Sequence, residues 1–110
     1  MHVWSGLYKS GVISYKKKGF MCSCDLIDIQ IQGKAAHGSR PEDSISPINI
    51  GCHIYLALQE LIAREIPPYE QAVITLGSFN SGNTCNQIPN TATLGATLRC
   101  ENESIRLFLQ

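Results

Sequence analysis

Hydrophobic and polar residues alternate along two stretches of the chain. In residues 25–32, Ile27, Ile29 and Ile31 are separated by polar side chains, and in residues 91–100 alanine and leucine alternate mainly with threonine. A period of two is typical of strands that bury one face, and β-branched residues favour strands. We therefore predict strands at 25–32 and 91–100. A shorter apolar run at 72–79 predicts another strand between them.

A helical pattern separates the first two predicted strands. Its apolar stripe consists of Ile50, Ile54, Leu58 and Leu61. This spacing is that of an amphipathic helix of about four to five turns. Ser46 followed by Pro47 is typical of a helix start, and Pro67 and Pro68 are expected to end the helix because a residue before proline avoids helical geometry.

The order of the predicted elements defines the fold class. Residues 33–43 and 80–90 are rich in Gly, Ser, Pro or Asn and are predicted to be loops, and a second helix is predicted to begin near Glu101. The order β-α-β-β-α predicts an α+β fold, a ferredoxin-like antiparallel sheet with helices on one face. The closing strand of such a fold is not found in the sequence. We therefore expect a fragment of a larger protein, or a different construction.

Composition and charge narrow the possible partners. The 110 residues carry nine basic and nine acidic side chains, and 44% of residues are hydrophobic. A neutral chain offers no general field for nucleic acid, and no stretch reaches the ~18 apolar residues of a membrane span. We therefore expect neither nucleic-acid nor membrane partners.

The first residues and the cysteines indicate the cellular compartment. Residues 1–18 lack the apolar core of a signal peptide, and five cysteines cannot all form disulfides with one another. These features predict reduced thiols in a cytoplasmic protein.

Three polar residues are candidates for chemistry because of their positions. His37 lies in the loop after the first strand, Asn86 in the connection between the later strands, and Arg99 near the end of the last strand. Loop residues often carry function, but a surface histidine, a turn asparagine and a solvated arginine are ordinary alternatives. The cysteines lack zinc-site spacing and are interpreted as small buried or half-buried thiols. No complete active site is recognisable.

Together, the segments around these three residues resemble a known family. The sequence at 33–41 (Gly-Lys-Ala-Ala-His-Gly-Ser-Arg-Pro), the Ser-Pro-Ile helix start at 46–48, the Asn-Gln-Ile-Pro sequence at 86–89 and the strand ending in Leu-Arg at 98–99 occur in the same order in that family. They resemble the lid, or dimerisation, domain of metal-dependent aminoacylases, carboxypeptidases and hippurate hydrolases. The segment 1–22 resembles the connector from the catalytic domain, which makes 23–110 the lid domain.

The resemblance implies a division of labour between domains. A separate catalytic domain would hold two divalent metal ions, usually zinc, and a glutamate base, so this chain alone would be inactive and would contain no metal ligand. His37 would reach into the active site of a partner subunit and stabilise the oxyanion. Asn86 and Arg99 would hold the carboxylate of an N-acyl amino acid or small peptide. The domain would form a homodimer through its first helix and a sheet edge.

Two other hypotheses remain at this stage. The chain could be a free-standing ferredoxin-like module that binds a ligand or a partner without catalysis. The exposed edge strand of its sheet would then have to be covered by another segment, because unpaired edges promote association. Alternatively, the five cysteines could belong to a small metal-binding protein.

Overall fold

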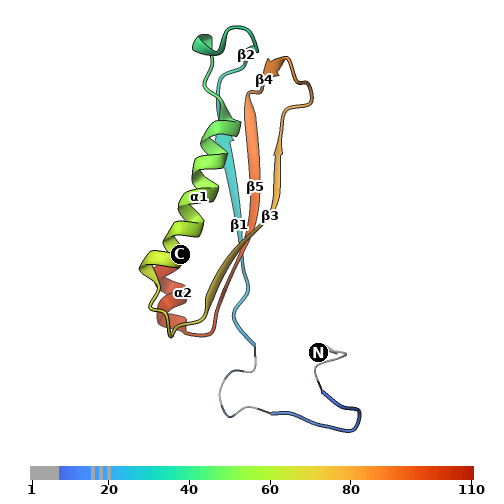
Figure 1. Ribbon diagram of the computed structural model, residues 1–110, viewed down its shortest axis with the longest axis vertical. Helices are drawn as coiled ribbons and strands as arrows, with labels where there is room; N and C mark the ends of the chain where they lie inside the picture. The colour runs from blue at the N-terminus through green and yellow to red at the C-terminus, as the bar shows by residue number, and fades with distance from the viewer. Residues whose placement is uncertain (1–7, 16, 18, 20) are drawn as a thin grey trace.

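The chain forms a three-stranded antiparallel sheet covered by two helices. The computed structural model describes residues 8–15, 17, 19 and 21–110. The sheet contains β1 (Asp25–Gln32), β3 (Ala72–Ser81) and β5 (Thr91–Cys100) in the order β1-β5-β3. The long strands run side by side along the molecule (Figure 1). The α+β class and the antiparallel sheet predicted from the pattern are confirmed.

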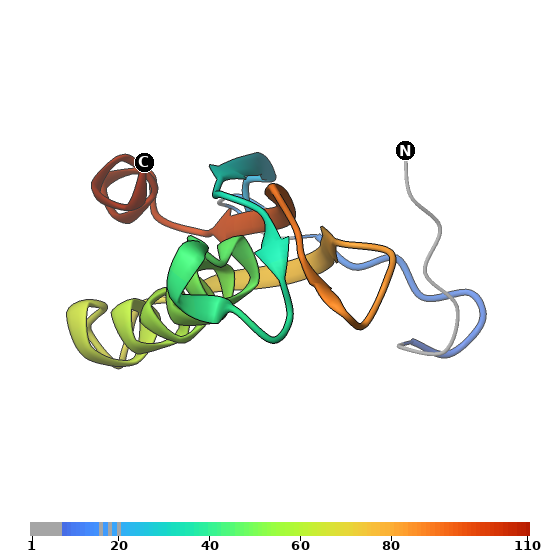
Figure 2. The same cartoon turned by 90° about the horizontal axis from the view of Figure 1, so that it is seen from above.

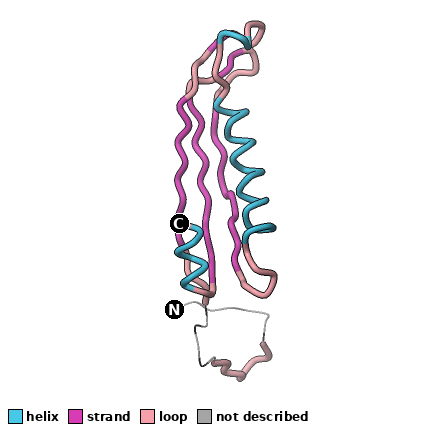
Figure 3. Tube along the Cα trace, turned by 90° about the vertical axis from the view of Figure 1, so that its left-hand side faces the viewer, coloured by secondary structure: helices cyan, strands magenta, loops and turns pink. Residues whose placement is uncertain are grey.

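The helices α1 (Pro47–Glu65) and α2 (Glu103–Leu109) pack against the same face of the sheet. Ser46 caps α1 by accepting a hydrogen bond from the Asn49 N–H, and Pro47 occupies the first turn, as the sequence predicts. Figure 2 looks along the strands and places both helices on one side of the sheet. Figure 3 looks onto the helices, with α1 beside β3 and α2 beside β1.

The core lies between the helices and the central strand. On β5 every second residue is buried, from Ala92 to Cys100, so one whole face of that strand is covered. Leu94 and Leu98 are among the most completely buried side chains. Leu58, Leu61 and Ile62 of α1 pack against this face, together with two residues of α2, Ile105 and Leu109. The alternating apolar residues from which β5 was predicted are therefore the residues that the helices bury.

A bulge in β3 changes which side chains of that strand face α1. The register with β5 shifts between Leu76 and Ser78, so Gly77 is an extra residue. An extra residue moves later side chains to the opposite face. Phe79 consequently lies against α1, where a Cβ added at Gly51 would overlap its ring at 2.5 Å. Glycine at position 51 thus allows the helix to approach the aromatic ring.

Two short strands lie where the sequence predicts only loops. β2 (Ala36–His37) pairs with β4 (Gln87–Ile88), and a 3-10 turn, η1 (Pro41–Asp43), follows β2. Both strands lie beyond the same end of the main sheet, opposite the end that carries α2 (Figure 1). The loop prediction is wrong at these four residues. A strand of two residues has no periodicity, and only pairing across distant segments creates it.

An ion pair joins α2 to β1. Arg106 donates to both carboxylate oxygens of Asp25, at 2.7 Å from Nε and 2.6 Å from Nη2. These bonds hold the pKa of the Asp25 carboxyl below its usual range and raise the pKa of Arg106. Two parallel bonds fix the orientation of the guanidinium as well as its distance. The pair therefore sets where α2 lies along β1.

Asp25→Asn is expected to lower the melting temperature by several degrees near neutral pH. Because the pKa of Asp25 is lower in the folded state, the ionised carboxylate stabilises the fold above the unfolded pKa of about 3.9, and this contribution is lost as pH falls through the folded value. The difference between variant and wild type should therefore vanish in acid. Melting curves across pH measure it. Asp28→Asn, at an exposed site of the same strand, is the matched control, and a pH-independent difference would contradict the prediction.

The segment before β1 is only partly described. Residues 8–15 contain no strand. The lysine run at 16–18 and residues 1–7 of the expected leader fall mostly or wholly outside the described residues. In the part of the chain that the structure describes, neither helix has the length and apolar character needed to cross a membrane.

Candidate functional site

The pairing of β2 with β4 brings His37 and Asn86 together. His37 lies opposite Gln87, and the Gly38 N–H donates to the Asn86 carbonyl at 2.8 Å. Both side chains are exposed. They line one shallow hollow with Ala35, Ala36 and Gln87. Two residues 49 positions apart in the sequence thus belong to a single surface at one end of the domain.

Asn90 forms hydrogen bonds between the two segments that carry His37 and Asn86. Its side-chain Oδ1 accepts a hydrogen bond from the Ala35 N–H at 3.0 Å, and its carbonyl accepts one from the Gly33 N–H at 2.7 Å. Gly33 is required here because a Cβ would overlap the Ile45 carbonyl oxygen. Sequence reasoning missed this tie, because an asparagine in a polar loop gives no sign of a partner 55 residues away.

The ring of His37 is held from one side by Ser39. The Ser39 N–H donates to His37 Nδ1 at 3.2 Å, and the Ser39 hydroxyl lies 2.8 Å from the same nitrogen. The Arg40 N–H closes the turn on the His37 carbonyl at 2.8 Å. Sequence reasoning also missed Ser39, although its place two residues after the histidine is the spacing that such a contact needs.

Arg99 lies at the other end of the sheet. It is the ninth residue of β5, opposite Val73 of β3, whereas the strand begins beside the loops that carry His37 and Asn86. Arg99 lies eight residue steps along the strand from Thr91, a distance of about 26 Å at 3.3 Å per residue. The exposed Arg99 side chain points away from the helices and forms no ion pair with a described residue. The structure therefore does not bring Arg99 to His37 within one chain.

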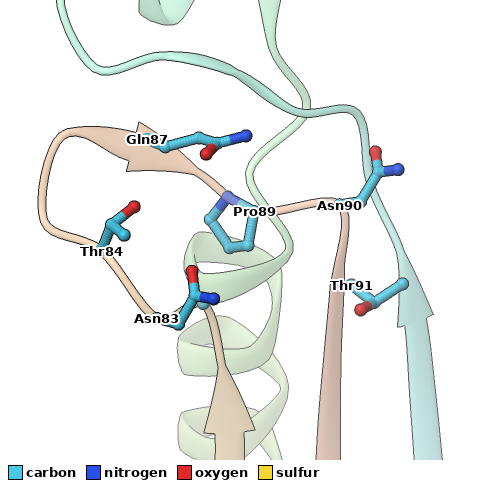
Figure 4. A pocket seen from close by; sticks show the side chains of 7 residues that line it. Asn83, Thr84, Gln87, Pro89, Asn90 and Thr91 are labelled. Atoms are coloured by element: carbon cyan, nitrogen blue, oxygen red, sulfur yellow. The ribbon is translucent and has the colours of Figure 1, made fainter.

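A second hollow adjoins the first across β4. It is lined by Gly82 and by the side chains shown in Figure 4, which are mostly amides and hydroxyls. Gly82 has a positive φ of 65° that favours glycine, and a Cβ added there would lie 3.6 Å from the Pro89 ring. Gln87 lines both hollows. The connection from β3 to β5 thus presents neutral hydrogen-bonding groups beside Asn86.

The cysteines do not form a site among the described residues. Cys100 is buried, and burial raises the pKa of its thiol, while the other four cysteines are exposed rather than half-buried as expected. In residues 8–15, 17, 19 and 21–110, no three His, Cys, Asp or Glu side chains are grouped to hold a metal ion. The metal ions that the resemblance implies therefore fit no group of described residues.

The fold defines a class of protein, a small α+β domain that presents polar side chains at one end of an antiparallel sheet. Residues 22–107 match the model of the peptidase dimerisation domain, and the chain belongs to that family. The fold resembles a Staphylococcus aureus structure described as an aminohydrolase, with a TM-score of 0.80 at 26% identity over 86% of this chain and 25% of that one.

Curated relatives are hydrolases and peptidases. Hippurate hydrolase from Campylobacter jejuni is 38% identical over 95 residues, which cover 84% of this chain and 25% of that enzyme. Thermostable carboxypeptidase 2 from Saccharolobus solfataricus is 36% identical over 102 residues, covering 93% of this chain and 26% of that enzyme. The chain spans about a quarter of the length of the relatives it matches. The resemblance predicted from its motifs is confirmed.

Proposed function

We propose that this domain dimerises and caps the substrate in a longer metal-dependent amidohydrolase that cleaves N-acyl amino acids or small peptides. One observation carries the proposal. His37 and Asn86 share one end of the sheet, and Arg99 stands alone at the other end. The names of the relatives support the reaction class, because a hippurate hydrolase and a carboxypeptidase both act on amide bonds beside a carboxylate.

Each of the three side chains suits one part of that reaction. An exposed imidazole can donate a hydrogen bond to the oxyanion that develops when the amide carbonyl is attacked. The guanidinium of Arg99 can bind a carboxylate through two parallel bonds, and it forms no ion pair with a described residue that would compete. The Asn86 amide adds a neutral donor next to His37. These roles stabilise charge and hold substrate, and they leave activation of water to another domain.

The separation of about 26 Å between the two ends of the sheet indicates that one chain does not complete a site. A two-fold axis that pairs identical edge strands antiparallel places opposite ends of the two sheets side by side. His37 and Asn86 of one subunit would then lie at the end where the partner subunit's Arg99 lies. β1 begins at Asp25, which lies opposite Leu98, so the first residue of β1 is at the Arg99 end of the sheet. We infer that Arg99 serves its own subunit, while His37 and Asn86 serve the partner.

The surface available for such pairing is continuous over α1 and β3. Four residues on the outer side of α1 are exposed and share one stripe: Ile48, Cys52, Tyr55 and Leu56. β3 lies beside α1 and has an unpaired outer edge, because β5 pairs with its other edge. Exposed apolar stripes and open edges are typical of surfaces that another chain covers. We propose this surface as the dimer interface.

Leu56→Glu is expected to weaken the dimer about 30-fold or more, because a charge would be buried within the apolar stripe. Sedimentation equilibrium of the variant and wild type measures the change in Kd. Leu26→Glu is the matched control, since Leu26 is also an exposed leucine but lies on β1, away from this surface. Equal dissociation constants for Leu56→Glu and wild type would place the interface elsewhere.

The lone domain is expected to lack hydrolytic activity. Its described residues supply donors for substrate and oxyanion but no grouped ligands for a metal, and none of those that line the hollow with His37 is a carboxylate. The metal would polarise the scissile carbonyl and activate water when bound in the catalytic domain. Catalysis thus requires both domains, and the domain described here contributes recognition and charge stabilisation.

A further inference from the structure

The two contacts made by Ser39 bear on the protonation of His37. A neutral imidazole carries one proton, on either Nδ1 or Nε2, and the other nitrogen accepts hydrogen bonds. A backbone N–H can only donate, and the Ser39 N–H points at His37 Nδ1 with a distance of 3.2 Å. Nδ1 must therefore present its lone pair to Ser39. The Ser39 hydroxyl, 2.8 Å from the same atom, can donate to it as well.

The hydrogen bonds to Nδ1 determine the protonation of Nε2, the other ring nitrogen of His37. With Nδ1 serving as an acceptor, the proton of the neutral ring resides on Nε2. No described residue forms a hydrogen bond with Nε2, so that N–H is directed outward from an exposed side chain. An N–H donor with no competing partner is the group that an oxyanion needs. The other tautomer would present a lone pair to the oxyanion and repel it.

We propose that Ser39 is a positioning residue that fixes the tautomer and orientation of His37, so that Nε2–H is the donor offered to the substrate. The inference rests on the proposed role of His37 and adds to it a residue that touches neither substrate nor metal. The turn supports it, because the Arg40 N–H bonds the His37 carbonyl and the Gly38 N–H bonds Asn86, which fixes Ser39 relative to the ring.

The tautomer can be measured in this chain without any reaction. Nitrogen-15 spectra of the ring, recorded in alkali where imidazoles are neutral, distinguish a protonated from an unprotonated Nδ1. We expect His37 to show a single form, with the proton on Nε2. His53 is exposed on α1 and serves as an internal reference for a solvated histidine. A His37 signal that matches His53, or a protonated Nδ1, would overturn the inference.

The catalytic consequence is tested with three variants of the full-length hydrolase. Ser39→Ala removes the hydroxyl contact and should lower kcat about three- to tenfold, the value of one ordinary hydrogen bond, with KM nearly unchanged. Ser39→Thr keeps a hydroxyl and should restore most of kcat. Ser44→Ala is the control, because the Ser44 hydroxyl bonds only the Pro41 carbonyl of the same loop. Equal kcat values for Ser39→Ala and wild type would contradict a positioning role.

The two parts of the test separate this inference from the proposed function. If the spectra show the Nε2–H form but His37→Ala leaves kcat unchanged, the proposed role of His37 fails. If His37→Ala is inactive but His37 resembles His53 in the spectra, the role of His37 stands and the role of Ser39 fails. Ser39→Ala removes the hydroxyl contact but keeps the backbone N–H contact, so it should move the His37 nitrogen shifts only part of the way towards those of His53. A serine that did not touch the ring would leave these shifts unchanged.

Discussion

His37→Ala in the proposed full-length hydrolase is expected to lower kcat by about 10²–10³-fold, the usual cost of removing one oxyanion donor. The loss should be larger in kcat than in KM, because the proposed hydrogen bond strengthens only as the carbonyl oxygen gains charge. His37 is exposed and lies at the end of a two-residue strand, so its removal creates no cavity in the core. Steady-state kinetics with an N-acyl amino acid measures the effect.

Two controls make the His37 experiment specific. His53→Ala removes an exposed histidine from α1, away from β2 and β4, and should leave kcat unchanged. Metal content, measured on each purified variant, should equal that of wild type, because His37 belongs to no group of metal ligands among the described residues. A His37→Ala enzyme with normal kcat would remove His37 from the mechanism, whatever the state of the metal.

Mixing two inactive variants of the full-length hydrolase is expected to restore activity. A His37→Ala subunit keeps its own Arg99, and an Arg99→Ala subunit keeps its own His37. If each active site takes Arg99 from its own subunit and His37 from the partner, one of the two sites in the mixed dimer is intact. Random exchange makes about half of the dimers mixed, so activity should reach about a quarter of the wild-type value.

A mixture that stays inactive would show that the two residues do not come from different subunits. If His37 and Arg99 served the same site from one chain, both sites of every mixed dimer would lack one residue, and mixing would restore nothing. The Leu56→Glu change, introduced into both variants, is the control, since it should weaken the dimer and abolish the restoration. Kinetics before and after subunit exchange, with dimer formation followed by sedimentation, distinguishes the outcomes.

The elements with regular periodicity could be predicted from the sequence. β1 and β5 have the predicted bounds, 25–32 and 91–100, because one face of each strand is covered along its length. α1 begins at the predicted proline, since Ser46 caps it as its side chain allows. β3 extends two residues beyond the predicted 72–79, because the bulge at Gly77 interrupts the alternation by which its end would be recognised.

The arrangement of the candidate site was less accessible from the sequence. His37, Asn86 and Arg99 were selected one by one, and their resemblance to family motifs grouped them. Their geometry depends on the pairing of two strands of only two residues and on the length of β5, neither of which a local pattern reveals. Ser39 and Asn90 were not predicted, because the hydrogen bonds that each forms cannot be recognised from the sequence of a loop.

The length of β5 has a consequence for how such an enzyme can change. If the two ends of the sheet serve different catalytic centres, the number of residues in β5 determines the distance between those centres. Deleting one residue of β5 would turn Arg99 to the helix-covered face. Deleting two residues would keep Arg99 on its present face but shorten the strand by about 7 Å. The central strand can therefore change in length only if the spacing of the two catalytic centres in the dimer changes with it.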